Sequence, residues 1–336
     1  MISNSTKTLV VVLKADKDIG TGHLMRVKAI LPYLKNVTCY LVSDSISKEL
    51  YQICDDFERI AVTTKDNLAH TALSFKPDVV LVDHYFLDKS FEASIYHQTK
   101  VVVIDDLVNR PHQCHMLFDA WVLRKPEEYK KLVNPQCELC VGSEYNYIRK
   151  EFSKIHKVEN DTARPRVLVN FGGADPAHAV LMTTKTIVEH KLYEKFNFTI
   201  VAGMSNHDFE KIKELVTGIS SISLTKHTNN VPKLFSKIDL AIGAAGGMFS
   251  ERNLAKIPSI VVEIADNQKG TCDFVKNYNI GIPLLLEELS DPNKLTVALQ
   301  TLYTNKGIYE RNCAKLYNSN GLQNVVDKIQ GLIDHA

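Results

Sequence analysis

Short apolar runs rich in valine, isoleucine and leucine alternate along this chain with amphipathic segments of helical length. Strands that are buried on both faces of a sheet appear as continuous apolar runs, so this alternation predicts parallel α/β units. In the first half of the chain we expect strands at 9–13, 37–42, 78–82 and 101–104, and the clearest helices at 23–34 and 89–98. In the second half we expect strands at 166–170, 197–202, 222–224, 240–242 and 259–262, and helices at 177–190, 208–217, 249–256, 268–277 and from Pro292 to the end.

The length of the chain, 336 residues, is too great for one ordinary core and comfortable for two. The segment 154–164 is polar and charged, contains no apolar run and leads into Pro165, so we place a domain boundary there. The predicted domains are residues 1–155 and 156–336, and each begins with a strand, a glycine-containing loop and a helix. The residues after Asn277 carry no recognisable motif, and we interpret them as completing the second domain and packing back on the first.

The composition and charge exclude several classes of protein. Apolar residues make up 45% of the chain and charged residues 24%, which is typical of a globular protein, and the formal net charge of +1 gives no reason to expect a nucleic-acid partner. No stretch approaches the roughly 20 apolar residues of a membrane helix, and residues 1–7 lack the apolar core of a signal peptide. We therefore expect a cytoplasmic protein with no membrane partner, as a monomer or a weak homo-oligomer.

The cysteines do not indicate a metal site. There are seven of them at scattered spacings, which fits reduced thiols. Cys137 and Cys140 form a single CxxC pair, and the nearest additional zinc ligands would be Cys114, His112 and His115. The favoured interpretation is that Cys140 lies in a buried strand, so we expect no metal and no cofactor.

The loop at 15–26 follows the first predicted strand, and ligands bind open α/β sheets outside the carboxyl ends of their strands. Gly20 and Gly22 allow this loop to turn tightly and to approach a ligand. The dinucleotide-binding pattern GxGxxG fails here, because Met25 occupies the position of the third glycine. This departure argues against a nicotinamide enzyme.

His23 ends that loop and would lie in the first turn of the following helix. The positive end of the helix dipole disfavours an imidazolium there, so a neutral histidine that accepts a proton at pH 7 is one interpretation. The alternative, which has equal weight on spacing alone, is a histidine that caps the helix or forms a local hydrogen bond. Asp16 and Asp83 are both candidates to orient the ring, and the sequence does not choose between them.

Polar residues also follow two other predicted strands of the first half. The run 83–85 comes directly after one of them, and Asp83 is a candidate to cap the next helix. Asp105 and Asp106 come directly after another. Paired carboxylates can bind Mg²⁺, but the favoured interpretation is that one caps a helix and the other is solvated.

Two glycine-containing loops follow predicted strands of the second half. The loop at 170–176 resembles a phosphate-approach loop, but it lacks the Lys-Ser/Thr pair of a P-loop. The loop at 242–251 contains Gly243, Gly246 and Gly247 where a strand ends and a helix starts. Free N–H groups at that helix start would suit a diphosphate.

Side chains near these loops suit the remainder of a nucleotide sugar. Glu251, one turn into the helix, could accept a hydrogen bond from a ribose hydroxyl. Asn267 and Gln268 follow another predicted strand, and side-chain amides bind uncharged sugar hydroxyls and N-acyl groups well.

Taken together and in order, these loops resemble the PseG family, the UDP-2,4-diacetamido-2,4,6-trideoxy-β-L-altropyranose hydrolases of pseudaminic acid biosynthesis, with related spore-coat polysaccharide proteins. The resemblance runs from about Leu9 to Asn277. It is carried by Asp16 with Ile-Gly-Thr-Gly-His-Leu-Met-Arg (19–26), Val-Asp-His-Tyr (82–85), Ile-Asp-Asp-Leu (104–107), Gly-Ser-Glu-Tyr-Asn-Tyr-Ile-Arg-Lys-Glu-Phe (142–152), Phe-Gly-Gly-Ala-Asp (171–175), Gly-Ala-Ala-Gly-Gly-Met-Phe-Ser-Glu (243–251) and Ala-Asp-Asn-Gln (265–268).

The resemblance implies a GT-B-like α/β fold similar to that of MurG, with two Rossmann-like domains whose parallel sheets face a central cleft. It implies that water attacks the anomeric carbon of a UDP-sugar with inversion, that the C–O bond breaks and that UDP leaves. The family's catalytic histidine falls on His23, its sugar-side tyrosine on Tyr85 and its sugar-side asparagine on Asn267, and Glu251 is the implied ribose contact. The predicted substrate-binding residues are Asp16, Gly20, Gly22, Arg26, Tyr85, Gly173, Ala245, Gly246, Gly247, Met248, Glu251, Asn267 and Gln268.

The sequence departs from the family pattern in two places. Lys14 stands where the family usually has arginine, and Gly247-Met-Phe-Ser replaces a commoner Ser-Thr-x-Trp run. Side-chain contacts to phosphate are therefore less certain to follow the family than backbone contacts. In the leading hypothesis the C-terminal half holds UDP and the N-terminal half presents the sugar to His23. The alternatives are a glycosyltransferase with the same donor and a nucleotide-sugar-binding module without catalysis.

Overall fold

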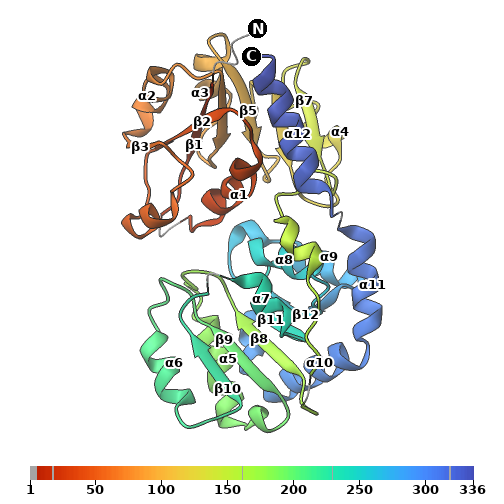
Figure 1. Ribbon diagram of the computed structural model, residues 1–336. Coiled ribbons are helices and arrows are strands. Elements are labelled where there is room, and N and C mark those ends of the chain that lie inside the picture. The colour runs from red at the N-terminus through yellow and green to blue at the C-terminus, as the bar shows by residue number, and fades with distance from the viewer. Residues whose placement is uncertain (1–5, 17–18, 161, 229, 318) are drawn as a thin grey trace. The chain divides into compact units, whose positions relative to one another are not determined.

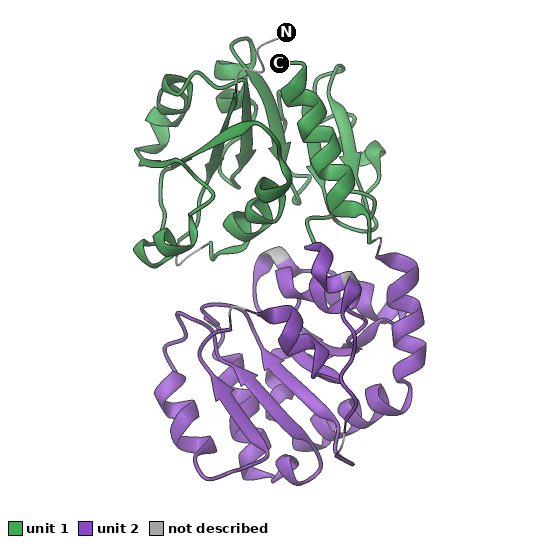
Figure 2. Cartoon of the chain, in the orientation of Figure 1, with its two compact units in different colours: residues 1–148, 318–336 green, residues 149–317 purple. Residues whose placement is uncertain are grey.

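The computed structural model describes residues 6–16, 19–160, 162–228, 230–317 and 319–336, apart from the side chains of Ser153 and Asn267. The chain forms two compact units (Figure 2), which we call unit 1, residues 1–148 and 318–336, and unit 2, residues 149–317.

Unit 1 is an α/β unit with one parallel sheet (Figure 1). Its strands are β1 (Lys7–Leu13), β2 (Val37–Ser43), β3 (Arg59–Val62), β4 (Val79–Asp83), β5 (Lys100–Ile104), β6 (Met116–Asp119) and β7 (Glu138–Val141). Its α-helices are α1 (Gly22–Ile30), α2 (Leu68–Ser74), α3 (Lys89–Tyr96), α4 (Pro126–Tyr129) and α12 (Gly321–Asp334), with short 3-10 turns η1 (Leu31–Tyr33), η2 (Lys48–Ile53) and η3 (Lys65–Asn67).

Unit 2 repeats this plan. Its parallel strands are β8 (Arg166–Asn170), β9 (Asn197–Val201), β10 (Ile222–Thr225), β11 (Leu240–Ala244), β12 (Ser259–Val262) and β13 (Gly281–Pro283). Its α-helices are α5 (Ala179–Glu189), α6 (Phe209–Val216), α7 (Val231–Ser236), α8 (Gly247–Leu254), α9 (Thr271–Tyr278), α10 (Pro292–Thr304) and α11 (Lys306–Leu316). Its 3-10 turns are η4 (Lys150–Lys154), η5 (Leu192–Glu194), η6 (Asp266–Gln268) and η7 (Leu286–Ser290).

The predicted strands and helices are confirmed to within about two residues at most of their ends, with a 3-10 turn completing the helix expected at 23–34. β7 contains the buried Cys140, as expected. The sequence analysis did not specify β3, β6 or β13. These strands have only three or four residues each, and too few side chains are present for an apolar run to be distinguished from a loop.

In each sheet the first three strands are added in one direction, and the later strands are added on the other side of the first strand. The strand order is β3-β2-β1-β4-β5-β6-β7 in unit 1 and β10-β9-β8-β11-β12-β13 in unit 2. The changes of direction therefore lie between β1 and β4 and between β8 and β11. Ligands of doubly wound sheets bind at such points, because the loops after the two central strands diverge there. The fold places the loops after β1, β4, β8 and β11 where a ligand site is expected.

The core of unit 1 occupies both faces of its sheet, since alternate residues of a strand point to opposite faces. Leu9, Val11 and Leu13 of β1 join one apolar cluster, and Val10 and Val12 join the other. A separate apolar cluster forms the core of unit 2. The predicted fold class, two Rossmann-like parallel-sheet domains, is confirmed. None of the helices in the described ranges is long and apolar enough to span a bilayer.

The chain divides differently from the predicted boundaries of 1–155 and 156–336. Unit 1 ends at Ile148, and residues 318–336 return to it at the end of the chain. The apolar face of α12 causes this return, because it packs beside α1 in the core of unit 1 (Figure 1). The residues that α12 buries there are Leu322, Val325, Val326, Ile329 and Ile333.

We predict that Ile329→Ala lowers the free energy of unfolding of unit 1 by about 2–5 kcal/mol, because it leaves a cavity at a fully buried position. Asp327→Ala, at an exposed position of the same helix, is the matched control and should change that free energy by less than about 0.5 kcal/mol. Trp121, the single tryptophan of the chain, lies in unit 1 and reports on its unfolding in urea. Equal effects of the two substitutions would contradict a core role for α12.

Candidate active site

The loop after β1 turns at Gly20, whose φ of 81° is in the left-handed region that favours glycine. The Gly20 amide donates to the carbonyl of Asp16 at 2.8 Å, and the Ile19 amide donates to the Asp16 carboxylate at 3.0 Å. Helix α1 begins one residue before His23, which is therefore in the first turn as predicted. Asp16 thus has a structural role within the loop.

His23 is 3% exposed, and its Nδ1 hydrogen-bonds to the carboxylate of Asp83. Asp83 is the last residue of β4 and is paired in register with Leu13, the last residue of β1. The partner of His23 is thus 60 residues away in the sequence, so the interpretation as a local helix cap is wrong. Of the two candidates for orienting the ring, the structure selects Asp83.

Arg26 lies one turn after His23 on the same face of α1 and binds the same carboxylate. Its Nε donates to Asp83 at 2.5 Å, its Nη2 makes a second contact with Asp83, and its Nη1 donates to Asp106 at 2.9 Å. Burial by itself raises the pKa of Asp83, but the charges and hydrogen bonds of Arg26 and His23 outweigh burial and hold that pKa well below its ordinary value. Asp83 is therefore an anion at neutral pH.

Tyr85 packs against the histidine. Its ring lies edge-on to the imidazole of His23, with 4.4 Å between the centroids, and its hydroxyl donates to Asp106 at 3.2 Å. The predicted site residues His23, Arg26 and Tyr85 are thus brought together by tertiary contacts. Asp106 joins them, although the sequence analysis gave it no role in the site.

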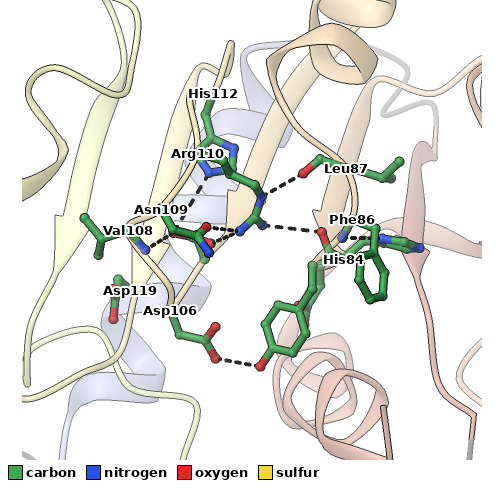
Figure 3. Close-up of polar contacts among 12 residues, drawn as sticks. His84, Phe86, Leu87, Asp106, Val108, Asn109, Arg110, His112 and Asp119 are labelled. Carbon is green, nitrogen blue, oxygen red and sulfur yellow. Dashed lines mark hydrogen bonds and ion pairs between the residues drawn. The ribbon is translucent and has the colours of Figure 1, made fainter. Parts of the chain in front are cut away.

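Arg110 connects the loops that carry Tyr85 and Asp106 (Figure 3). Its guanidinium donates to the carbonyl of Leu87 at 2.8 Å and forms an ion pair of 2.8 Å with Asp105. Because the guanidinium of Arg110 binds groups of both loops, Tyr85 and Asp106 are held in place relative to each other.

The interpretation of Asp105 and Asp106 as a helix cap and a solvated side chain is wrong. No helix lies between β5 and β6, and Asp105 is 1% exposed. Its carboxylate accepts hydrogen bonds from the amide of Val108 at 3.0 Å and the hydroxyl of Tyr129 at 2.8 Å. The suggestion that Asp83 caps the next helix is also wrong, since Asp88 caps α3.

Three buried polar atoms around Arg26 have no hydrogen-bond partner among the described residues. They are Nε2 of His23, Oδ1 of Asp106 and the hydroxyl of Tyr147. The Arg26 guanidinium lies over the Tyr147 ring, 6.0 Å from its centroid. Since buried polar groups are normally paired, three open positions around one arginine indicate a place for a polar ligand. Tyr147 lies in the motif at 142–152, but nothing in the sequence distinguished it from its aromatic neighbours.

In unit 2 the two glycine-rich loops differ in one respect that matters for anions. The first two amides of α5 are already occupied, because Asp175 accepts from Ala179 at 3.0 Å and from Val180 at 2.9 Å. Helix α8 begins after Gly246 with no side-chain cap and no acidic residue in its first turn. The uncapped start of α8 is therefore the better anion site of the two.

Glu251 lies in α8, with a carboxylate oxygen 3.5 Å from Nη2 of Arg149. Burial raises the pKa of Glu251 to about 6, against the opposing effect of Arg149. Gln268 accepts from the amide of Ile264 at 3.0 Å, and its amide nitrogen lies close to Gly246.

The remaining predicted contacts of unit 2 are those of Gly173, Ala245, Met248 and Asn267. The Ala245 amide donates to the carbonyl of Val262 at 2.9 Å, so it is used within the sheet. The Gly173 carbonyl packs directly against Gly203. The side chain of Asn267 lies outside the described residues, and its sugar contact stays a prediction, as does the substrate contact of Met248. Within the described ranges, no group of three or more histidine, cysteine, aspartate or glutamate side chains is placed to hold a metal ion.

Asp119 gives unit 1 a testable dependence on pH. The Tyr129 hydroxyl lies 2.8 Å from both Asp105 and Asp119, although it has one proton to donate. Burial raises the pKa of Asp119 to about 6, against the opposing charge of Arg124. An acid whose pKa is raised in the folded state binds protons more tightly there, so its contribution to stability falls as the pH rises from about 4 to about 6.

We therefore predict that the contribution of Asp119 to the free energy of unfolding of the wild-type protein falls by on the order of 2 kcal/mol between about pH 4.5 and about pH 7. Asp119→Asn should abolish this fall. The measurement is urea unfolding of unit 1, followed by Trp121 fluorescence, for both proteins at both pH values. Parallel pH profiles for wild type and variant would contradict the raised pKa.

Comparison with known proteins gives one curated relative with a named activity. The chain is 24% identical over 272 residues to the UDP-2,4-diacetamido-2,4,6-trideoxy-beta-L-altropyranose hydrolase of Campylobacter jejuni, a match that covers 79% of this chain and 96% of that enzyme. An uncharacterized protein of Methanocaldococcus jannaschii is 22% identical over 269 residues, which are 76% of this chain and 55% of that protein. No family model matches the chain.

Solved structures similar to this one include a MurG protein and a UDP-GlcNAc 2-epimerase. Acinetobacter baumannii MurG superimposes with a TM-score of 0.65 and 15% identity over 97% of this chain and 99% of that chain. The UDP-GlcNAc 2-epimerase of Neisseria meningitidis, solved with UDP-GlcNAc bound, superimposes with a TM-score of 0.64 and 13% identity over 98% of this chain and 100% of that chain. At these identities the likeness establishes the fold. The chain is therefore similar to the curated Campylobacter hydrolase, as the resemblance of its motifs predicted, and has the GT-B fold.

Proposed function

We propose that this protein hydrolyses a UDP-linked diacetamido-trideoxy sugar of the type named for its Campylobacter relative, and releases UDP and the free sugar. This reaction would be a step in pseudaminic acid biosynthesis, in the cytoplasm. The observation that carries the proposal is the buried His23, whose Nδ1 is held by Asp83 while its Nε2 has no partner among the described residues.

That geometry is suited to a general base. With the proton of the neutral ring on Nδ1, donated to Asp83, the lone pair of Nε2 is free to accept a proton. A water molecule beside Nε2 loses its proton to His23 as it attacks the anomeric carbon, and the C–O bond to the diphosphate breaks with its electrons passing to UDP. A positioned base contributes roughly 10²–10⁴ to the rate.

The sugar contacts are assigned to the open polar positions of unit 1. Tyr85 flanks His23, and Asp106 and Tyr147 each have an unpartnered buried oxygen beside Arg26. A carboxylate oxygen accepts from sugar hydroxyl and acetamido N–H groups, and a phenol both donates and accepts. These groups suit an uncharged sugar with N-acyl substituents.

The UDP contacts are assigned to unit 2. The uncapped start of α8 at Gly246 and Gly247 would receive the diphosphate, and Glu251 would accept from the ribose. Gly173, Ala245, Met248, Asn267 and Gln268 complete the proposed substrate contacts of this unit, and Asp16, Gly20, Gly22 and Arg26 those of unit 1.

The reaction itself is tested by incubating the enzyme with UDP-2,4-diacetamido-2,4,6-trideoxy-β-L-altropyranose in H₂¹⁸O without any acceptor. We expect UDP release with the label on C1 of the sugar and none on UDP, which mass spectrometry detects. Label on UDP would contradict C–O cleavage. Release of UDP only after an acceptor is added would indicate a glycosyltransferase instead, and tight binding without turnover would indicate a binding module.

We predict that His23→Gln lowers turnover by roughly 10²–10⁴ with little change in UDP affinity, because the base is lost and the diphosphate contacts lie in unit 2. The control is His112→Gln, which alters a comparable buried pair, since His112 Nδ1 lies 2.7 Å from Glu92. This control should keep most of the turnover. Normal turnover in His23→Gln would refute the assignment of the base.

We also predict that Asp83→Asn lowers turnover by roughly 10²–10⁴, because an amide no longer fixes the ring tautomer or pairs with Arg26. Asp78→Asn is the matched control, since Asp78 lies just before the other end of the same strand, where it accepts from Lys7 and Thr8. Steady-state turnover, with circular dichroism to confirm folding, distinguishes the two. A similar loss in both variants would indicate general damage to β4 rather than a role at His23.

A further inference from the structure

Arg252, in α8, is a buried cation whose guanidinium is only partly hydrogen-bonded. It is 1% exposed, its Nε has no partner, and no carboxylate lies within ion-pair distance of it among the described residues. Its Nη2 donates to the carbonyl of Ala244 at 2.8 Å. Burial lowers the pKa of Arg252 to about 10, so the guanidinium is still charged at neutral pH.

A buried charge without an ion-pair partner is expensive, because desolvation is only partly repaid by attraction over a longer distance. The neighbouring Glu251 attracts Arg252 electrostatically, but its ion pair is with Arg149. Arg149 also lies 3.4 Å from Glu151, so one cation serves two carboxylates at this end of unit 2. Without Arg252 these groups would leave a net negative charge there, which would repel an anionic ligand.

The guanidinium lies against the backbone that leads into α8. A Cβ built on Gly243 would come within 2.7 Å of Nη1 of Arg252, and the hydrogen bond to Ala244 fixes the next residue. Two residues later the chain reaches Gly246, where α8 begins without a cap. The buried cation therefore lies against residues 243–244, shortly before the start of α8.

We propose that Arg252 is the counter-charge for the diphosphate of UDP at the start of α8, acting through the backbone of residues 243–244 rather than by direct contact. The inference rests on the proposed function, which assigns the diphosphate to this helix start. In a low-dielectric interior a charge is weakly screened, so the attraction extends through one layer of backbone. Arg252 is thus a positioning residue that also supplies charge.

The test compares UDP with uridine, because uridine lacks the diphosphate. We expect Arg252→Met to weaken UDP binding by roughly 10- to 100-fold while uridine binding is unchanged. Arg252→Lys keeps the charge and should recover much of the UDP affinity. Isothermal titration with UDP, with uridine measured by competition, gives the ratio of the two affinities for each protein.

Several outcomes would overturn the inference. An equal loss of UDP and uridine affinity in Arg252→Met would show a structural role only, and an unchanged UDP affinity would show no role. If Arg252→Met does not fold, Arg252→Lys is compared with Arg252→Gln. An equal fall in the ratio of UDP to uridine affinity in these two variants would also refute a role for the charge. Failure of the wild-type protein to bind UDP would instead refute the proposed function, so the two failures are distinguishable.

Discussion

The carboxylate of Asp83 binds His23 and Arg26 together, and the N-terminal site depends on this arrangement. Asp83 is fully buried, so it remains ionised only because a guanidinium and an imidazole compensate for its lost hydration. In return it fixes the ring of His23 through Nδ1 and leaves Nε2 open. Arg26 also donates to Asp106, and Asp106 in turn accepts from the hydroxyl of Tyr85. A single charge at the end of β4 thereby orders side chains from helix α1 and from the loops after β4 and β5.

The two units use the same sheet topology for different chemistry. In unit 1 the loops at the change of strand direction carry titratable side chains, which suit proton transfer. In unit 2 the corresponding loops carry glycine and an uncapped helix start, which suit anion binding. The buried Arg252 adds a fixed positive charge to the second arrangement. Hydrolysis of a nucleotide sugar needs both functions, and a fold of two similar units can supply one from each.

Much of this organisation could be predicted from the sequence, because it depends on local patterns. The apolar runs located β1, β4, β8 and β11, and the glycines of the loops marked where helices α1 and α8 begin. Asp83 was one of two predicted candidates to orient His23, but the sequence could not choose between them, and the role of Asp106 could not be predicted. An aspartate at the end of a strand looks the same whether it caps a helix or binds an arginine far away in the sequence. Tyr147 and Arg252 were missed for the same reason: their importance comes from an atom without a partner, and partners are set by tertiary contacts.

The sequence by itself determined the fold class, the position of His23 in the first turn of a helix and the similarity to a curated hydrolase. These follow from periodicity, glycine placement and ordered motifs, which are properties of neighbouring residues. Only the tertiary structure decided that Asp83 rather than Asp16 orients His23, that the returning segment of unit 1 is residues 318–336, and that the start of α8 rather than that of α5 lacks a side-chain cap on its amides. Each of those outcomes depends on which distant groups compete for one hydrogen bond or one apolar surface, and that competition is resolved only when the chain is folded.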